Sequence, residues 1–350
     1  MKKNLYRWGQ KILAEFLLGM SCLLLVGCAG KSADALDATI LQAEPISTEV
    51  TVTSKAEVEV SEDAVEEVYD QEPLAEWANS IEFDTAYRED REYVVQEKKN
   101  LIYDLGDTLE TRVLTPDGYA RTEVEEGGFE EFLRQYHMKP AGSKVHLYDG
   151  TEKADQSAHV AVFDLPIEDY DLQQCADSVM RMYAEYFWAT EQYDRIKFHF
   201  TNGSLVEYEK WRDGNRVTIN GNSVSWLKSK SKDTSYECFV RYLRTIFCYA
   251  GTLSMEKESE PTLLSLLKAG DVFLYGGNPG HVVMVVDVCE NEQGKKAFLL
   301  AQGYMPAQEF HLLKNERHSE DPWYYESEIT YPFSTPEYTF EEGCLRSLNY

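Results

Sequence analysis

Two polar residues stand at the ends of predicted strands within one stretch of the chain, residues 270–309. Three short apolar runs lie in this stretch, at residues 272–275, 282–288 and 297–301. Runs of this length, bounded by Gly, Asn and Pro, predict adjacent strands joined by tight turns. His281 opens the second run and Gln302 closes the third. A histidine held at the mouth of a sheet could act as a catalytic base, or it could simply cap its strand.

Cys175 is the residue that could supply a nucleophile. It lies near the start of a helix predicted over residues 172–188, where free N–H groups and the helix dipole stabilise a thiolate. A thiolate also needs a base and a third group that orients the base, and His281 and Gln302 are candidates for these roles. Gln174 could help to hold an oxyanion through its side chain. The alternative is that Cys175 is a buried structural thiol.

Cys238 competes with Cys175 for the role of nucleophile. It lies at the start of a second helix, predicted over residues 235–249, and is closer in sequence to the predicted strands. We favour Cys175 and keep Cys238 as the rival. Cys248 lies late in the same helix, away from its positive end, and is interpreted as a core residue.

Two other polar residues adjoin predicted strands. His159 begins a run that resembles the one after His281, and we expect it to be bonded locally at a strand end; the alternative is that it lines a polar site after Lys153 and Gln156. Asp287 follows His281 by six residues of strand, roughly 20 Å at about 3.3 Å per residue, so we interpret it as a turn former.

Pro261 is expected to open a short third helix that ends at Lys268.

The first 28 residues resemble a bacterial lipoprotein signal. Basic residues among the first eleven are followed by an apolar run over residues 16–26 and then by Gly27 and Cys28. The run is too short to be a convincing membrane-spanning helix. The resemblance implies cleavage before Cys28, lipidation of Cys28 and an extracytoplasmic protein held to the cell membrane by its lipid. An ordinary secretory signal or a short anchor is the alternative.

Composition and charge limit the remaining possibilities. The net charge of −27 argues against nucleic acid and anionic membrane surfaces as partners of the folded part. Residues 28–72 are expected to form a flexible acidic tether, residues 73–114 a loosely helical lead-in, and residues 115–350 a single α+β domain. The spacing of the cysteines and histidines indicates no metal site, and we expect no cofactor.

Two family resemblances follow from these motifs. The chain resembles a family of uncharacterised bacterial lipoproteins of unknown function. The matching stretches are residues 145–150, 171–177, 181, 184–186, 249–254, 270–287, 300–302 and 305–309. More distantly, the order of a helix with Cys, a Gly-Asp-Val-Phe strand, a His-led strand and a strand with a polar end resembles the NlpC-type cell-wall cysteine peptidases. The chain lacks their Asp-Cys-Ser-Gly-Phe signature and separates Cys175 from His281 by about a hundred residues.

The second resemblance implies a papain-like, NlpC-like core in which a small antiparallel sheet packs against helices. It also implies a cysteine hydrolase that acts on peptide or amide bonds of the cell envelope, with Cys175, His281, Gln302 and Gln174 as site residues. The alternative is a non-catalytic lipoprotein that keeps the fold and binds a peptide or glycan, because clefts rich in aromatic residues suit such ligands.

Overall fold

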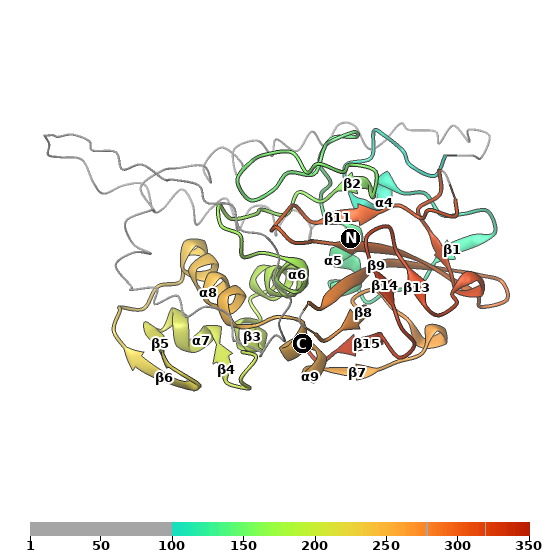
Figure 1. Ribbon diagram of the computed structural model, residues 1–350. Coiled ribbons are helices and arrows are strands. Elements are labelled where there is room, and N and C mark those ends of the chain that lie inside the picture. Colours follow the sequence, from blue (N-terminus) through green and yellow to red (C-terminus); the bar gives the residue numbers. More distant parts are fainter. Residues whose placement is uncertain (1–99, 278, 319) are drawn as a thin grey trace, which may run out of the picture. The chain divides into compact units, whose positions relative to one another are not determined.

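The computed structural model describes residues 100–350, except 278 and 319 (Figure 1). The expected signal, Cys28, the acidic tether and most of the helical lead-in lie outside the described residues. The helices are α4 (Leu109–Arg112), α5 (Phe129–Arg134), α6 (Cys175–Ala189), α7 (Tyr208–Arg212), α8 (Tyr236–Tyr249) and α9 (Thr252–Lys257). Short 3-10 helices are η2 (Tyr193–Arg195), η3 (Leu264–Leu266) and η4 (Glu326–Glu328).

An antiparallel sheet of nine strands organises the described residues. Its strands are β1 (Tyr119–Arg121), β2 (His159–Val162), β7 (Ser259–Pro261), β8 (Val272–Tyr275), β9 (His281–Asn291), β10 (Lys296–Gln302), β11 (His311–Leu313), β12 (Tyr324–Tyr325) and β15 (Leu345–Leu348). The main order is β2-β11-β10-β9-β8-β15-β7, while β1 pairs with β9 and β12 with β10. The sheet is therefore larger than the small sheet that was predicted, because strands far apart in the sequence join the three central ones.

Three separate hairpins accompany the sheet. They are β3 (Lys197–His199) with β4 (Leu205–Glu207), β5 (Asn215–Asn220) with β6 (Ser223–Lys228), and β13 (Phe333–Ser334) with β14 (Thr339–Phe340). The helix expected from Pro261 to Lys268 is wrong, because Pro261 is the last residue of the edge strand β7, which pairs with β15, and only the short 3-10 helix η3 lies in the rest of that range. An edge strand tolerates a proline because the missing N–H faces away from the sheet.

Both faces of the central strands are buried. On β9, Val282 and Met284 belong to the core that also contains α6 and α8, whereas Val283 and Val285 pack in a second cluster with residues of β13 and β14. This two-sided burial explains why β9 is almost continuously apolar instead of alternating with polar residues. The buried core also includes Leu101, Leu109 and Val113, so it begins before the expected boundary at residue 115.

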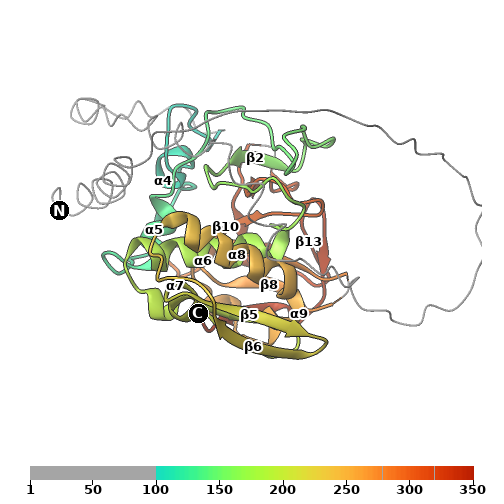
Figure 2. The same ribbon diagram turned by 90° about the vertical axis from the view of Figure 1, so that its left-hand side faces the viewer.

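Helix α6 lies between α8 and the sheet. Figures 1 and 2, viewed at right angles, both place α8 on the outer side of α6, and α6 packs against β9 and β10. The sequence accounts for this position because apolar side chains occur on nearly all sides of α6 and most of its residues are buried. The first residue of this enclosed helix is Cys175.

A buried ion cluster fixes the middle of β9. The Asp287 carboxylate accepts hydrogen bonds from Arg121 Nε at 2.7 Å and from Arg134 Nε at 2.7 Å. It also accepts one from the backbone of Val288. The interpretation of Asp287 as a turn former is wrong: the residue is fully buried inside a strand and ties β1 and α5 to the sheet.

Candidate functional site

The structure joins His281 and Gln302 at one end of the sheet. His281 is the first residue of β9 and Gln302 the last residue of β10, and these neighbouring strands are antiparallel. His281 Nε2 lies 2.8 Å from Gln302 Oε1. Both side chains are buried, with His281 only 3% exposed. The amide therefore fixes one ring nitrogen of the histidine and holds the ring in a defined orientation.

Aromatic side chains enclose the His281 ring. The rings of Tyr304 and Tyr338 each have centroids 4.8 Å from that of His281, and Phe340 lies 6.0 Å away. Burial lowers the pKa of His281 to about 4, although its hydrogen bond to Gln302 and the charge of Glu337 act in the opposite direction. The imidazole is therefore neutral at pH 7, with one ring nitrogen unprotonated.

Cys175 is the first residue of α6 and is 6% exposed. Burial raises the pKa of its thiol to about 12, and the negative charge of Asp177 in the same turn adds to this increase. Backbone hydrogen bonds, including one with Val282, act in the opposite direction. The start of a helix was expected to stabilise a thiolate, but in this enclosed, acidic first turn the thiol stays protonated at neutral pH.

Cys175 and His281 share several neighbours. Val282, which hydrogen-bonds the Cys175 side chain through its backbone, directly follows His281. A charge on Cys175 would also raise the pKa of Tyr304 and of Tyr338, the two phenols that pack on the His281 ring. The start of α6 and the end of the sheet therefore converge on one small volume.

A glycine permits this convergence. Gly303 follows Gln302, and a Cβ atom built on it would lie 2.4 Å from Ser178 Oγ and 3.0 Å from the backbone oxygen of Gln174. A residue with a side chain would therefore push the first turn of α6 away from the end of β10. The side chains of His281 and Gln302 lie on the face of the sheet that packs against β13 and β14, because they alternate with the same spacing as Val283 on β9 and Leu300 on β10, which belong to that cluster. Cys175 thus approaches them around the end of the sheet.

Gln174 is held by an acidic neighbour. Its Nε2 donates to Asp171 Oδ1 at 3.1 Å, and the same oxygen accepts a hydrogen bond from the backbone of Ala307. One of the two amide N–H groups of Gln174 is used in this way.

Two charged residues at the site were missed by sequence reasoning. Gln302 Nε2 donates to Glu337 Oε2 at 2.7 Å, and Lys153 Nζ lies 2.6 Å from both oxygens of Glu337. The aromatic tail around Glu337 was expected to wrap the domain or line a cleft, but no spacing pattern singled out this carboxylate. Only the pairing of β13 with β14 brings it to Gln302.

The competing residues lie elsewhere. Cys238 is fully buried in the core at the start of α8, where burial raises the pKa of its thiol. His159 Nε2 lies 3.1 Å from the backbone oxygen of Ser143, as expected for a residue bonded at a strand end. Within the described part of the chain, the thiols of Cys175, Cys238, Cys289 and Cys344 are not joined in disulfides.

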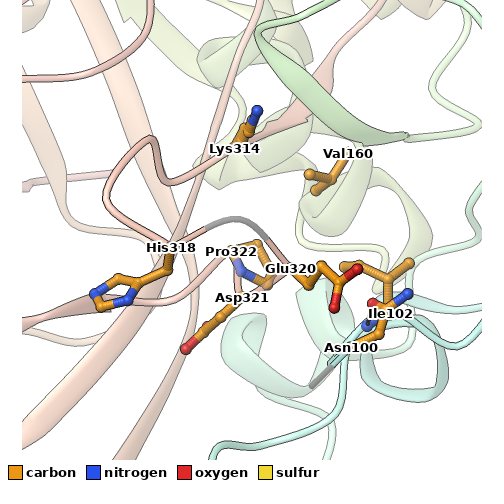
Figure 3. Close-up of a pocket in the computed structure, with 8 residues that line it drawn as sticks. All are labelled: Asn100, Ile102, Val160, Lys314, His318, Glu320, Asp321 and Pro322. Atoms are coloured by element: carbon orange, nitrogen blue, oxygen red, sulfur yellow. Dashed lines mark hydrogen bonds between the residues drawn. The ribbon is translucent and has the colours of Figure 1, made fainter.

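Surface hollows do not coincide with the predicted site. One, of about 200 Å³, is shown in Figure 3 and is lined by Asn100, Ile102, Val160, Lys314, His318, Glu320, Asp321 and Pro322. Another, of about 510 Å³, adjoins β3 and α9. Neither is lined by Cys175, His281, Gln302 or Gln174, and at His281 the rings of Tyr304 and Tyr338 pack directly on the imidazole.

Within the part of the chain that is described, no group of three or more His, Cys, Asp or Glu residues could hold a metal ion. No helix of these residues has both the length and the apolar character needed to cross a bilayer.

Comparison with known proteins gives a family without an assigned activity. Neither the curated proteins nor the solved structures yield a match. A family model described as a domain of unknown function (4846) matches residues 109–347, which is more than half of the chain and includes every residue of the candidate site. The chain therefore belongs to this family of unknown function.

Proposed function

We propose that this protein is a thiol hydrolase with a papain-like α+β core that cleaves peptide or amide bonds of cell-envelope material. The hydrogen bond of 2.8 Å between His281 and Gln302 carries the proposal. It lies at the end of the sheet where α6 begins with Cys175. A nucleophile at a helix start, a base on a strand and a polar residue that orients the base are the parts that such chemistry needs.

In the proposed reaction, the Cys175 thiol gives its proton to His281 Nδ1 while its sulfur attacks the carbonyl carbon. The C–N bond then breaks, and the departing amine takes the proton from the imidazolium. Water next attacks the resulting thioester with His281 again accepting a proton, and the C–S bond breaks to release the acid and restore the thiol. The second amide N–H of Gln174 would stabilise the oxyanion formed in both steps.

The electrostatics of the site define when the proton moves. Because burial keeps Cys175 protonated and His281 neutral, the resting pair is a thiol and an imidazole and not an ion pair. Proton transfer would therefore accompany attack on a bound substrate, when the substrate carbonyl begins to take up charge. The enclosing hairpin of β13 and β14 would have to move aside for that substrate to enter.

The proposed location rests on the beginning of the chain. Its basic, apolar and Cys28-containing segments resemble a lipoprotein signal, and this resemblance supports the proposal of an enzyme outside the cytoplasm with a lipid on Cys28. The substrate class follows from this location and from the resemblance to NlpC-type peptidases. The acidic chain, with a net charge of −27, favours such a substrate over nucleic acid.

Purified cell-wall fragments provide the test. The protein is incubated with soluble peptidoglycan fragments, and newly released amino groups are counted, in the wild type, Cys175→Ala and Cys238→Ala. We expect release by the wild type and by Cys238→Ala, and none by Cys175→Ala. Equal release by all three variants would remove Cys175 from the chemistry.

A non-catalytic binding protein is the second candidate. The high pKa and low exposure of Cys175 favour it, because a buried neutral thiol is a poor nucleophile. In that case the aromatic residues around His281 would hold a peptide or glycan. The same fragments would then bind to the wild type, as measured by calorimetry, without the release of any amino group.

A further inference from the structure

The side chain of Gln302 makes opposite hydrogen bonds at its two ends. Its Oε1 lies 2.8 Å from His281 Nε2, and its Nε2 donates to Glu337 Oε2 at 2.7 Å. The two ends of a carboxamide are almost equal in shape, but one accepts hydrogen bonds and the other donates them. Shape alone therefore does not decide which end faces the histidine.

Glu337 can act only as an acceptor in this arrangement. Lys153 Nζ lies 2.6 Å from each of its oxygens, and His311 Nε2 lies 3.8 Å from Oε2. Burial raises the pKa of Glu337, but His311 and Lys153 outweigh burial, so that the pKa lies below its ordinary value. The side chain is therefore a carboxylate at neutral pH and has no proton to donate.

We propose that Glu337 is a positioning residue that sets the tautomer of His281 through Gln302. A carboxylate at position 337 requires the NH₂ end of Gln302 to face it, so the oxygen of the amide faces His281. His281 Nε2 must then carry the ring proton, and Nδ1 keeps the lone pair that takes the thiol proton. The catalytic meaning of this tautomer rests on the proposed function, but the tautomer itself does not.

The hairpin of β13 and β14 holds Glu337 in place. Phe333 pairs with Phe340 across the two strands, and the backbone N–H of Thr335 donates to the oxygen of Tyr338 at 2.8 Å. Glu337 thus lies on a closed turn, and the ring of the next residue, Tyr338, packs at a tilt of 40° against the His281 ring. The same turn supplies both the wall of the site and the charge that orients Gln302.

Removal of the charge should let the amide turn over. In Glu337→Gln, residue 337 can present its own NH₂ group, and Gln302 then turns its oxygen away from His281. The NH₂ end of Gln302 facing the ring would require an unprotonated Nε2 and place the proton on Nδ1, where no base remains. In the double variant Gln302→Glu with Glu337→Gln, the new carboxylate at position 302 lies directly beside His281 Nε2. Because a carboxylate only accepts hydrogen bonds, Nε2 must again carry the ring proton, although position 337 has no charge.

The experiment measures ¹⁵N ring shifts of His281 at pH 7 in the full chain, together with release of amino groups from cell-wall fragments. We expect the Nε2–H tautomer in the wild type, conversion towards Nδ1–H in Glu337→Gln with hydrolysis reduced about 10²- to 10⁴-fold through loss of the general base, and recovery of both in the double variant. Glu341→Gln, the same substitution at an exposed residue nearby, should behave as the wild type.

Three results would overturn the inference: the Nδ1–H tautomer in the wild type, an unchanged tautomer and rate in Glu337→Gln, or a double variant no better than the single one. The wild-type spectrum decides the first point even if a variant fails to fold. If the wild type hydrolyses nothing, the proposed function fails, while the ring shifts still test the role of Glu337.

Discussion

Replacement of Gly303 by alanine tests how closely the start of α6 is docked on the end of β10. The new Cβ would lie 2.4 Å from Ser178 Oγ and 3.0 Å from the backbone oxygen of Gln174. Ser178 is fully buried, so its hydroxyl has little room to rotate away. The helix start must therefore shift, and this shift would move Cys175 relative to His281.

The expected cost combines two opposing effects. Overpacking of a dense interior costs about 1–3 kcal/mol, and the reduced freedom of the unfolded chain returns about 0.4–1 kcal/mol. Taken at matching ends of the two ranges, the net loss is roughly 0.6–2 kcal/mol, which for a domain of this size lowers Tm by about 1–8 °C at 2–4 °C per kcal/mol. The rate of hydrolysis by folded Gly303→Ala should also fall, by more than the unfolded fraction explains, because the reaction depends on the placement of Cys175.

Thermal unfolding of a variant set provides the measurement. Ser178→Ala removes the atom at 2.4 Å, and that buried hydroxyl has no hydrogen-bond partner within the described residues, so this substitution alone should cost little. The double variant Gly303→Ala with Ser178→Ala should recover at least half of the lost stability. A Gly303→Ala protein as stable as the wild type, or a double variant no more stable than Gly303→Ala, would refute the docking described for α6.

Further predictions concern burial, charge and access. The pKa of His281 falls from 6.5 to about 4 on folding, so the contribution of this residue to stability is complete above pH 6.5 and is lost as the pH falls to 4. In denaturant titrations, the free energy of unfolding of the wild type should therefore fall by about 3 kcal/mol more than that of His281→Gln between pH 6.5 and 4. The same pH dependence in both proteins would contradict this prediction. Asp287→Ala leaves two arginines without their carboxylate, so the free energy of unfolding measured in urea should fall by about 3–5 kcal/mol. The fall should be smaller for Asp287→Asn. An Asp287→Ala protein as stable as the wild type would argue against the ion cluster. Tyr338→Ala opens the cover over the site, so alkylation of Cys175 by iodoacetamide, followed by mass spectrometry, should become faster, and an unchanged rate would show that access lies elsewhere.

The central strands could be predicted from the sequence because their apolar runs end at strong turn residues. The observed β8, β9 and β10 contain the three predicted runs, and His281 and Gln302 stand at strand ends as expected. Local patterns were sufficient here, because short turns leave few other ways to pair these strands.

Pairings between distant segments could not be predicted in the same way. Strand β15 inserts between β8 and β7 from the far end of the sequence, so neither the full sheet nor the strand at Pro261 was expected. Asp287 was misinterpreted for the same reason, because the arginine of α5 that pairs with it lies 153 residues earlier. Glu337 reaches Gln302 from 35 residues later, on a turn that carries no catalytic pattern.

The protonation states at the site also depended on packing. The sequence predicted a thiolate from the position of Cys175 near a helix start, but that position says nothing about the layers that enclose it. In the structure the sheet and α8 lie on opposite sides of α6, and burial outweighs the helix dipole at the thiol.

A trapped acyl-enzyme would test the proposed thiol hydrolase most directly. The full-length protein is mixed with peptidoglycan fragments, quenched in acid within the first turnover, and the peptide that contains Cys175 is analysed by mass spectrometry. We predict a thioester adduct on Cys175 that is absent from Cys238 and is not formed in His281→Ala. Hydrolysis of the fragments without any adduct on Cys175, or an adduct that forms equally well in His281→Ala, would contradict the proposal.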